Sequence, residues 1–169
     1  MNPESYPRRI LLCVAGLSPQ IVTETLYALT VTVEPRFVPT EIHLITTRSG
    51  AEKARLALLS DEPGWFHHLC RDYALPPMRF DAGIVHVVVE GNGQVLEDIL
   101  SPDDNRHAAD GITELVREFT ADPDCALHVS IAGGRKTMGF FLGYALSLYG
   151  RPQDQLSHVL VSEPFESSI

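Results

Sequence analysis

Two short turns in this chain carry residues suited to binding phosphate. The segments Ala15–Gln20 and Ala132–Thr137 each follow an apolar run of the kind that forms a buried strand. Each pattern predicts a strand ending in a turn of small residues that opens a helix, where free backbone N–H groups and the helix dipole attract anions. The second turn also holds Arg135, Lys136 and Thr137, which can donate hydrogen bonds to phosphate oxygens.

A third segment belongs with these turns. Thr46–Ser49 also follows a predicted strand. In an open parallel sheet, ligands bind beyond the carboxyl ends of the strands, where the strand order reverses. We therefore expect all three segments to lie on one edge of the sheet.

These segments do not match the common nucleotide-binding motifs. In a Walker A loop, glycine precedes the Lys-Thr pair, but here the preceding residue is Arg135, and Ser130 stands at the position of the first glycine. The dinucleotide fingerprint fails at both turns, and Gln20 breaks the nucleophile-elbow pattern around Ser18. No standard cofactor is indicated.

Metal binding is not expected either. The segment from His67 to Asp72 contains His, Cys and Asp, but no second ligand pair stands at metal spacing. We interpret it as a solvated helix. Trp65 and Phe66, just before it, could stack on adenines, although a core or dimer-contact role is favoured.

Hydrophobic periodicity predicts strands that alternate with helices. The expected strands are Arg8–Val14, Glu41–Thr46, Ile84–Val89, Ala126–Ile131 and Ser157–Val161, and the expected helices are Pro19–Val33, Arg48–Leu59, Pro63–Tyr73, Ser101–Thr120 and Lys136–Tyr149. This alternation predicts an α/β, Rossmann-like, doubly wound fold with a mainly parallel sheet.

Local signals place the helix ends. Ser18 is expected to be the N-cap of the first helix, and Ser49 and Glu52 have the spacing of a capping box. Asp98 is interpreted as a cap or a solvated charge. The helix Lys136–Tyr149 is apolar nearly all round, so we expect it to be buried.

Composition excludes several classes of protein. The chain has 169 residues and a formal net charge of −9, so long nucleic acid is not an expected partner. No apolar run approaches the roughly 20 residues of a membrane span, and the first residues do not resemble a signal peptide. The three cysteines are widely spaced, which fits a reducing cytoplasm.

The loop motifs together resemble those of CRISPR-associated Rossmann-fold (CARF) proteins, and the small stand-alone ring nucleases among them above all. The resemblance joins Gly16–Glu24, Thr46–Ser49, Ala132–Met138 and the closing Leu160–Glu166, so it spans nearly the whole chain. It implies a homodimer that binds a cyclic oligoadenylate across its two-fold axis, with cyclic tetra-adenylate the expected ligand.

The resemblance also implies the site residues. Ser18, Arg135 and Lys136 are the expected catalytic residues, and the expected ligand contacts are Gly16, Leu17, Gln20, Thr46, Thr47, Arg48, Gly133, Gly134 and Thr137. Cleavage would use no metal. The ribose 2′-OH would attack phosphorus and leave a 2′,3′-cyclic phosphate, with gains from positioning and from stabilising charge.

Alternatives remain open at this stage. Residues 1–169 are expected to form one CARF domain, either a stand-alone ring nuclease or a domain whose effector part was cut away. The chain could then be a sensor that binds without cleaving. A generic α/β protein that binds a mononucleotide is a further alternative.

Overall fold

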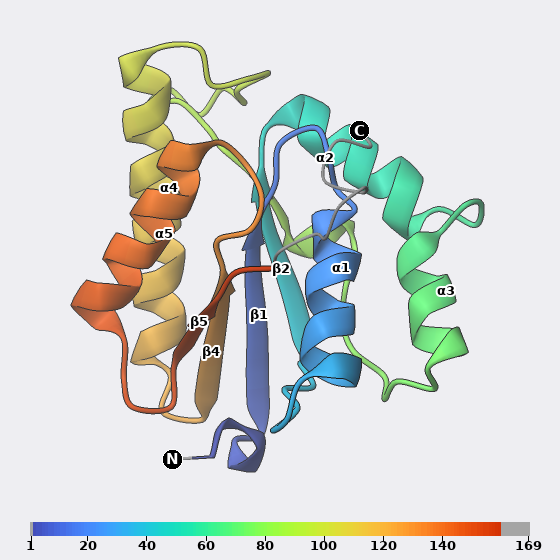
Figure 1. Cartoon of the computed structure of the whole chain (residues 1–169). Helices are drawn as coiled ribbons and strands as arrows, with labels where there is room; N and C mark the ends of the chain where they lie inside the picture. The colour runs from blue at the N-terminus through green and yellow to red at the C-terminus, as the bar shows by residue number, and fades with distance from the viewer. Residues whose placement is uncertain (1, 160–169) are drawn as a thin grey trace.

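A parallel five-stranded sheet forms the centre of the computed structural model, which describes residues 2–159 (Figure 1). The strands are β1 (Arg8–Val14), β2 (Glu41–Thr46), β3 (Val85–Val87), β4 (Cys125–Ser130) and β5 (Gln155–Ser157). Their order is β3-β2-β1-β4-β5, and every neighbouring pair is parallel. The predicted Rossmann-like α/β fold is confirmed.

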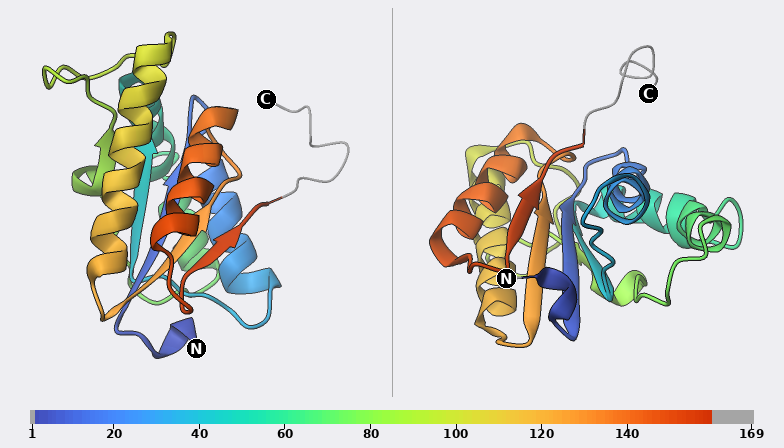
Figure 2. Two further views of the ribbon diagram at one scale, coloured as in Figure 1. Left: turned by 90° about the vertical axis from the view of Figure 1, so that its left-hand side faces the viewer. Right: turned by 60° about the horizontal axis from the view of Figure 1, so that its bottom comes forward.

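Helices cover both faces of this sheet (Figures 1 and 2). The helices α1, α2 and α3 lie on one face, and α4 and α5 lie on the other. Their bounds are α1 Ile21–Tyr27, α2 Arg48–Ala54, α3 Trp65–Asp72, α4 Pro102–Ala121 and α5 Lys136–Tyr149. The π-helical segments Ala28–Thr32 and Arg55–Leu59 continue α1 and α2, and two 3₁₀ turns span Pro3–Ser5 and Ala82–Ile84.

The apolar run of β1 shows why the sheet lies between two layers. From Ile10 onward every residue of this strand is buried. Ile10 and Leu12 pack into the core beneath α4 and α5, while Leu11 and Cys13 pack into the core beneath α1 and α3. A strand with both faces covered reads as a continuous apolar run rather than an alternating one.

Two predicted helix caps are wrong. The helix α1 begins at Ile21, and Gln20 rather than Ser18 stands at its N-cap, without a side-chain cap. The reason is an intervening turn, in which the backbone N–H of Val22 donates to the Pro19 carbonyl. In α2 the cap is Thr47, whose hydroxyl accepts from the Gly50 N–H, so the predicted capping box is not formed.

The start of α4 follows the sequence signal. Ser101 caps the helix by accepting from the Asp104 N–H, and the Asp104 carboxylate accepts from the Ser101 N–H. The expected helix start is confirmed. The last strand begins two residues earlier than expected, at Gln155, and residues 160–169 of the C-terminal motif lie outside the described residues.

The prediction that α5 is buried is wrong. Phe140, Tyr144 and Leu148 are 65%, 57% and 59% exposed, and they lie four residues apart along the helix. Only Met138, Leu142 and Ala145 are buried there. The sheet and α4 cover one side of α5, and no described element covers the other (Figure 2).

No helix within residues 2–159 is long and apolar enough to cross a membrane. The cysteines in this part of the chain are free thiols. Cys13 in β1 and Cys125 in β4 are buried, and burial raises the pKa of Cys13 to about 12. A thiol with so high a pKa is a poor nucleophile at neutral pH.

Buried His128 links the stability of the fold to pH. Its Nε2 lies 2.8 Å from the Ser157 hydroxyl oxygen in a hydrogen bond between β4 and β5, and burial lowers its pKa to about 4. A histidine in the unfolded chain titrates near 6.5. The unfolded state therefore binds more protons between these pH values, so His128 makes the fold less stable as pH falls through this window.

We expect His128→Gln to reduce that loss. Between pH 7 and 4.5 the wild-type free energy of unfolding should fall by about 2 kcal/mol more than that of the variant, because glutamine takes up no proton. Urea unfolding at both pH values measures the difference. His43 and His86, whose pKa values burial also lowers, are present in both proteins, so they do not affect the comparison. Equal losses in the two proteins would contradict this account.

Candidate functional site

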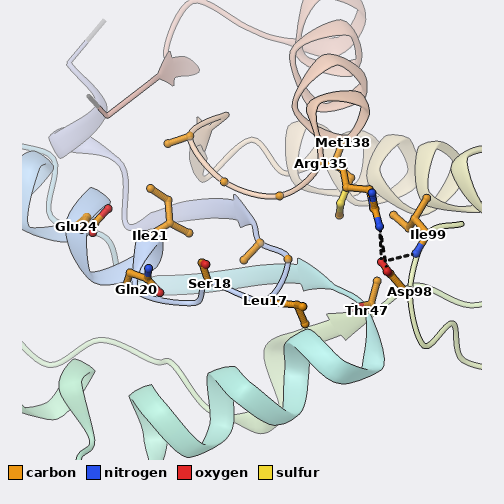
Figure 3. Close-up of a pocket in the computed structure, with 15 residues that line it drawn as sticks. Leu17, Ser18, Gln20, Ile21, Glu24, Thr47, Asp98, Ile99, Arg135 and Met138 are labelled. Carbon is orange, nitrogen blue, oxygen red and sulfur yellow. Dashed lines mark hydrogen bonds and ion pairs between the residues drawn. The ribbon is translucent and has the colours of Figure 1, made fainter. Parts of the chain in front are cut away.

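A pocket of about 460 Å³ opens between the carboxyl ends of β1 and β4. The chain leaves β1 toward α1 on one face and leaves β4 toward α5 on the other, so this is the point where the strand order reverses. The lining residues are Ala15, Gly16, Leu17, Ser18, Gln20, Ile21, Glu24, Thr47, Asp98, Ile99, Ala132, Gly133, Gly134, Arg135 and Met138 (Figure 3).

Open backbone forms part of the pocket wall. A Cβ added to Gly16 would meet nothing within 4 Å, so a ligand can approach the main chain closely there. The backbone N–H groups of Gly16, Leu17, Gly133 and Gly134 find no acceptor among residues 2–159. Backbone donors of this kind at the start of a helix are suited to an anion.

Two glycines shape the loop that follows β4. A Cβ on Gly133 would lie 2.4 Å from the Val14 carbonyl oxygen and 2.8 Å from a side-chain carbon of Ile21. Gly134 has a φ of 75°, a left-handed conformation that favours glycine. These glycines let the loop pack against the end of β1, so they have a structural role whatever the ligand is.

Arg135 is the cation of the pocket, and a carboxylate already holds it. Its Nη2 donates to both carboxylate oxygens of Asp98, at 3.1 and 2.9 Å (Figure 3). Asp98 also accepts from the N–H of Ile99. The interpretation of Asp98 as only a cap or solvated charge is therefore wrong. Since both side chains are about half exposed, the pair adds little stability.

Glu24 brings a second carboxylate to the pocket. No residue among 2–159 forms an ion pair with it, and burial raises its pKa. With Arg135 as the cation and Glu24 and Asp98 as the carboxylates, the lining has a formal charge of −1. Anion binding there depends on backbone N–H groups and on cations beside the pocket.

The structure brings together most of the predicted site residues. Those that line the pocket are Gly16, Leu17, Ser18, Gln20, Thr47, Gly133, Gly134 and Arg135. Ser18 is exposed, and its hydroxyl forms no hydrogen bond within the described residues. Because Ser18 does not cap α1, its hydroxyl is available to a ligand.

Two predicted residues lie next to the pocket rather than in it. Lys136 and Thr137 line an adjoining hollow that shares Gly134 and Arg135 with the pocket. Lys136 is exposed at the first turn of α5, where the helix dipole disfavours a cation without a nearby anion. The Thr137 hydroxyl donates to the Asn105 side chain at 2.9 Å.

The other two lie outside both hollows. Thr46 is fully buried, and its hydroxyl has no hydrogen-bond partner within residues 2–159. A Cβ on Gly50 would meet that hydroxyl oxygen at 2.0 Å, so Thr46 packs beneath the start of α2. Arg48 is exposed and forms ion pairs with Glu52 and Glu97.

Sequence reasoning missed several lining residues, of which Asp98 and Ile99 are the clearest. They come from the long connection between β3 and α4, which turns back on itself: the Leu96 N–H donates to the Val88 carbonyl, and the Glu90 N–H donates to the Gln94 carbonyl. The sequence Gly91-Asn92-Gly93 indicates a turn in that connection, but nothing local shows that the residues after it reach the pocket. Within residues 2–159, no group of three or more His, Cys, Asp or Glu side chains could hold a metal ion.

The surroundings of Gly133 and Gly16 predict different effects on the Tm when each is replaced by alanine. Gly133→Ala should lower the Tm by roughly 2–10 °C, because the new methyl group must displace the backbone of β1. Gly16→Ala should leave the Tm nearly unchanged, since its Cβ meets open space. Thermal unfolding followed by circular dichroism measures both. A Gly133→Ala protein as stable as wild type would contradict the packing described here.

Comparison with known proteins supports the assignment of the fold. Enterococcus italicus Csm6, solved bound to cyclic hexa-2'-fluoro-hexa-dAMP, is similar with a TM-score of 0.54 and 13% sequence identity. The match covers 94% of this chain and 34% of Csm6, so the chain spans about a third of that protein. Among curated proteins, none matches.

The family follows from a second comparison. The family model described as CRISPR-associated protein NE0113 matches residues 18–169, which include the first loop segment from Ser18 onward, the other two loop segments and both helical layers. This match covers far more than half of the sequence, and it agrees with the resemblance carried by the loop motifs. The chain therefore belongs to the CRISPR-associated NE0113 family.

Proposed function

We propose that this protein binds a cyclic oligoadenylate, cyclic tetra-adenylate above all, and cleaves it to linear products, ending a type III CRISPR signal. The observation that carries the proposal is the pocket at the switch point, where backbone donors, Ser18 and Arg135 converge with Lys136 beside them. Csm6, which shares the fold, was solved with a cyclic oligoadenylate analogue bound.

Binding would depend on backbone donors and a few cations. The free N–H groups near Gly16 and Gly133, in the loops that precede α1 and α5, are suited to a phosphodiester. Lys136 then supplies the positive charge that the lining itself lacks. Arg135 can leave Asp98 and bind a phosphate instead, because the ion pair between Arg135 and Asp98 is half exposed and therefore weak.

The chemistry would be an in-line transesterification. The 2′-oxygen of one ribose forms a bond to the adjacent phosphorus, and the bond from phosphorus to the 5′-oxygen breaks. The 2′-OH loses its proton to solvent, and the departing 5′-oxygen gains one. Lys136 and Arg135 offset the charge of the phosphorane, and Ser18 orients the ribose. No histidine lines the pocket, which fits a slow enzyme.

A ring of four nucleotides would need two such pockets. In this proposal the protein is a symmetric dimer, and the apolar stripe Phe140, Tyr144 and Leu148 on α5 is its contact surface. The rings of Phe140 and Tyr144 stack 5.9 Å apart at 13°, so the two side chains form one continuous aromatic patch. An apolar patch of this kind marks an interaction site more often than a free surface.

Incubation of the purified protein with cyclic tetra-adenylate in excess chelator tests the function. We expect linear products that end in a 2′,3′-cyclic phosphate, because the attacking oxygen comes from the ligand and needs no metal-bound water. Chromatography and mass spectrometry identify them. Binding without products would make the protein a sensor, and tighter binding of AMP or ATP than of the ring would favour a generic nucleotide-binding protein.

Removing Lys136 should affect binding and rate together. Lys136→Ala is expected to leave the Tm unchanged, because the exposed side chain packs little. It should weaken binding and slow single-turnover cleavage at least tenfold, as a charge-assisted phosphate contact is worth about 1.5–3 kcal/mol. Ser18→Ala should slow cleavage with a smaller effect on binding.

Arg117→Ala provides the matched control for this experiment. It also removes an exposed cation, but from the outer face of α4, where Arg117 pairs with Glu114. This variant should bind and cleave like the wild type. If Lys136→Ala behaves like Arg117→Ala, the assignment of Lys136 to the site is wrong.

The dimer has its own test. Tyr144→Arg places a charge in the middle of the proposed contact and should convert the dimer to a monomer in sedimentation analysis. Leu56→Arg is the control, because Leu56 is 62% exposed on the π-helical continuation of α2, on the other side of the sheet. Wild-type protein that sediments as a monomer with and without ligand would contradict the dimer.

A further inference from the structure

A second hollow adjoins the pocket on the side of α1 and α3. It has a volume of about 470 Å³, and its walls include the residues named here the aromatic groove, which are Gln20, Glu24, Tyr27, Trp65, His68 and Tyr73. Gln20 and Glu24 also line the pocket (Figure 3). The two hollows therefore share a wall. A ligand that fills the pocket can therefore extend into the groove over α1.

Trp65 is placed where it does not serve the core. It is 56% exposed at the first position of α3, while its neighbour Phe66 is 5% exposed and packs against Phe80. Phe66 therefore packs in the core, and the Trp65 indole lies at the surface. The His68 ring, 5.6 Å from the indole at 44°, supports it from the same helix.

Two tyrosines extend this aromatic surface. The rings of Tyr27 and Tyr73 meet edge to face, 5.2 Å apart, and join α1 to the end of α3. They are 37% and 47% exposed, so their faces remain accessible. An accessible aromatic surface of this kind can stack on a nucleobase, because every base has a π-face.

The shared wall carries groups that suit an adenine edge. A glutamine amide can bond both N6 and N7 of adenine, and a carboxylate accepts from an exocyclic amino group. The Gln20 side chain is exposed, and no residue among 2–159 forms an ion pair with Glu24. A carboxylate between a phosphate site and an aromatic surface is a poor contact for phosphate but a suitable one for an amino group.

We propose that the aromatic groove is an adenine subsite, an inference that rests on the proposed function. A phosphodiester of the cyclic oligoadenylate lies in the pocket, and the attached adenine passes Gln20 and Glu24 and stacks on Trp65. Phosphate recognition and base recognition are then divided between two hollows. The subsite would select adenine over uracil, because the purine offers the larger stacking surface and the N6 and N7 edge.

Tryptophan fluorescence reports on this subsite directly, because Trp65 is the single tryptophan of the chain. Cyclic tetra-adenylate is titrated into the intact protein, with tryptophan fluorescence and calorimetry recorded in parallel. Stacking should quench the indole fluorescence with the same midpoint as the heat of binding. Calorimetric binding without a fluorescence change would overturn the adenine subsite. Absence of calorimetric binding would instead contradict the proposed function.

Variants separate stacking from general apolar contact. Trp65→Leu keeps an apolar side chain but loses the aromatic face, and it should weaken binding by about tenfold. Leu156→Ala is the control, because Leu156 is an exposed leucine on β5 that lines neither the pocket nor the aromatic groove. This control should bind normally.

A further variant tests base selectivity. Gln20→Ala should reduce the preference for cyclic tetra-adenylate over cyclic tetra-uridylate, because it removes the amide that can bond N6 and N7. An unchanged preference in both Gln20→Ala and Trp65→Leu would overturn the subsite. So would loss of the dimer, with normal ligand affinity per subunit, in Trp65→Leu, since the groove would then be a contact between copies.

Discussion

The parallel pairing of β1 with β4 is the interaction on which the site depends. Six residue pairs, from Arg8 with Cys125 to Cys13 with Ser130, hold these strands in register, so both end at the same level. The following loops diverge toward opposite faces of the sheet, and the pocket opens between them. Gly133 then fits against the Val14 carbonyl, where a larger residue would push the loops apart.

The pocket lining contains few charged side chains. The chain has a net charge of −9, and the pocket lining adds one guanidinium against two carboxylates. Such a surface repels a long polyanion, so binding must rely on short-range hydrogen bonds from the backbone. Lys136 adds a further positive charge only at the edge. This arrangement suits a small ligand with a few phosphates that can be surrounded.

The fold leaves two apolar surfaces without a partner in the described chain, and they lie on opposite faces of the sheet. The stripe on α5 consists of residues at helical spacing, and the aromatic groove joins α1 to α3. Burying either surface would release water from large apolar side chains. The groove is continuous with the pocket through Gln20 and Glu24, whereas the α5 stripe is not part of the pocket lining. The proposed ligand and the proposed second copy of the chain would therefore occupy different surfaces.

The sequence by itself determined the alternation of strands and helices, because an apolar run buried on both faces and an amphipathic helix each leave a local pattern. It also placed the two glycine turns that line the pocket, since their glycines and position after strands are local features. Only the tertiary structure decided that Asp98 neutralises Arg135 and that Thr46 is buried beneath Gly50. Both depend on contacts between segments far apart in the chain. The composition of α5 predicts a buried helix for the same reason, because it does not show which neighbours cover the helix. The exposed stripe on α5 follows from the position of this helix at the edge of the helical layer.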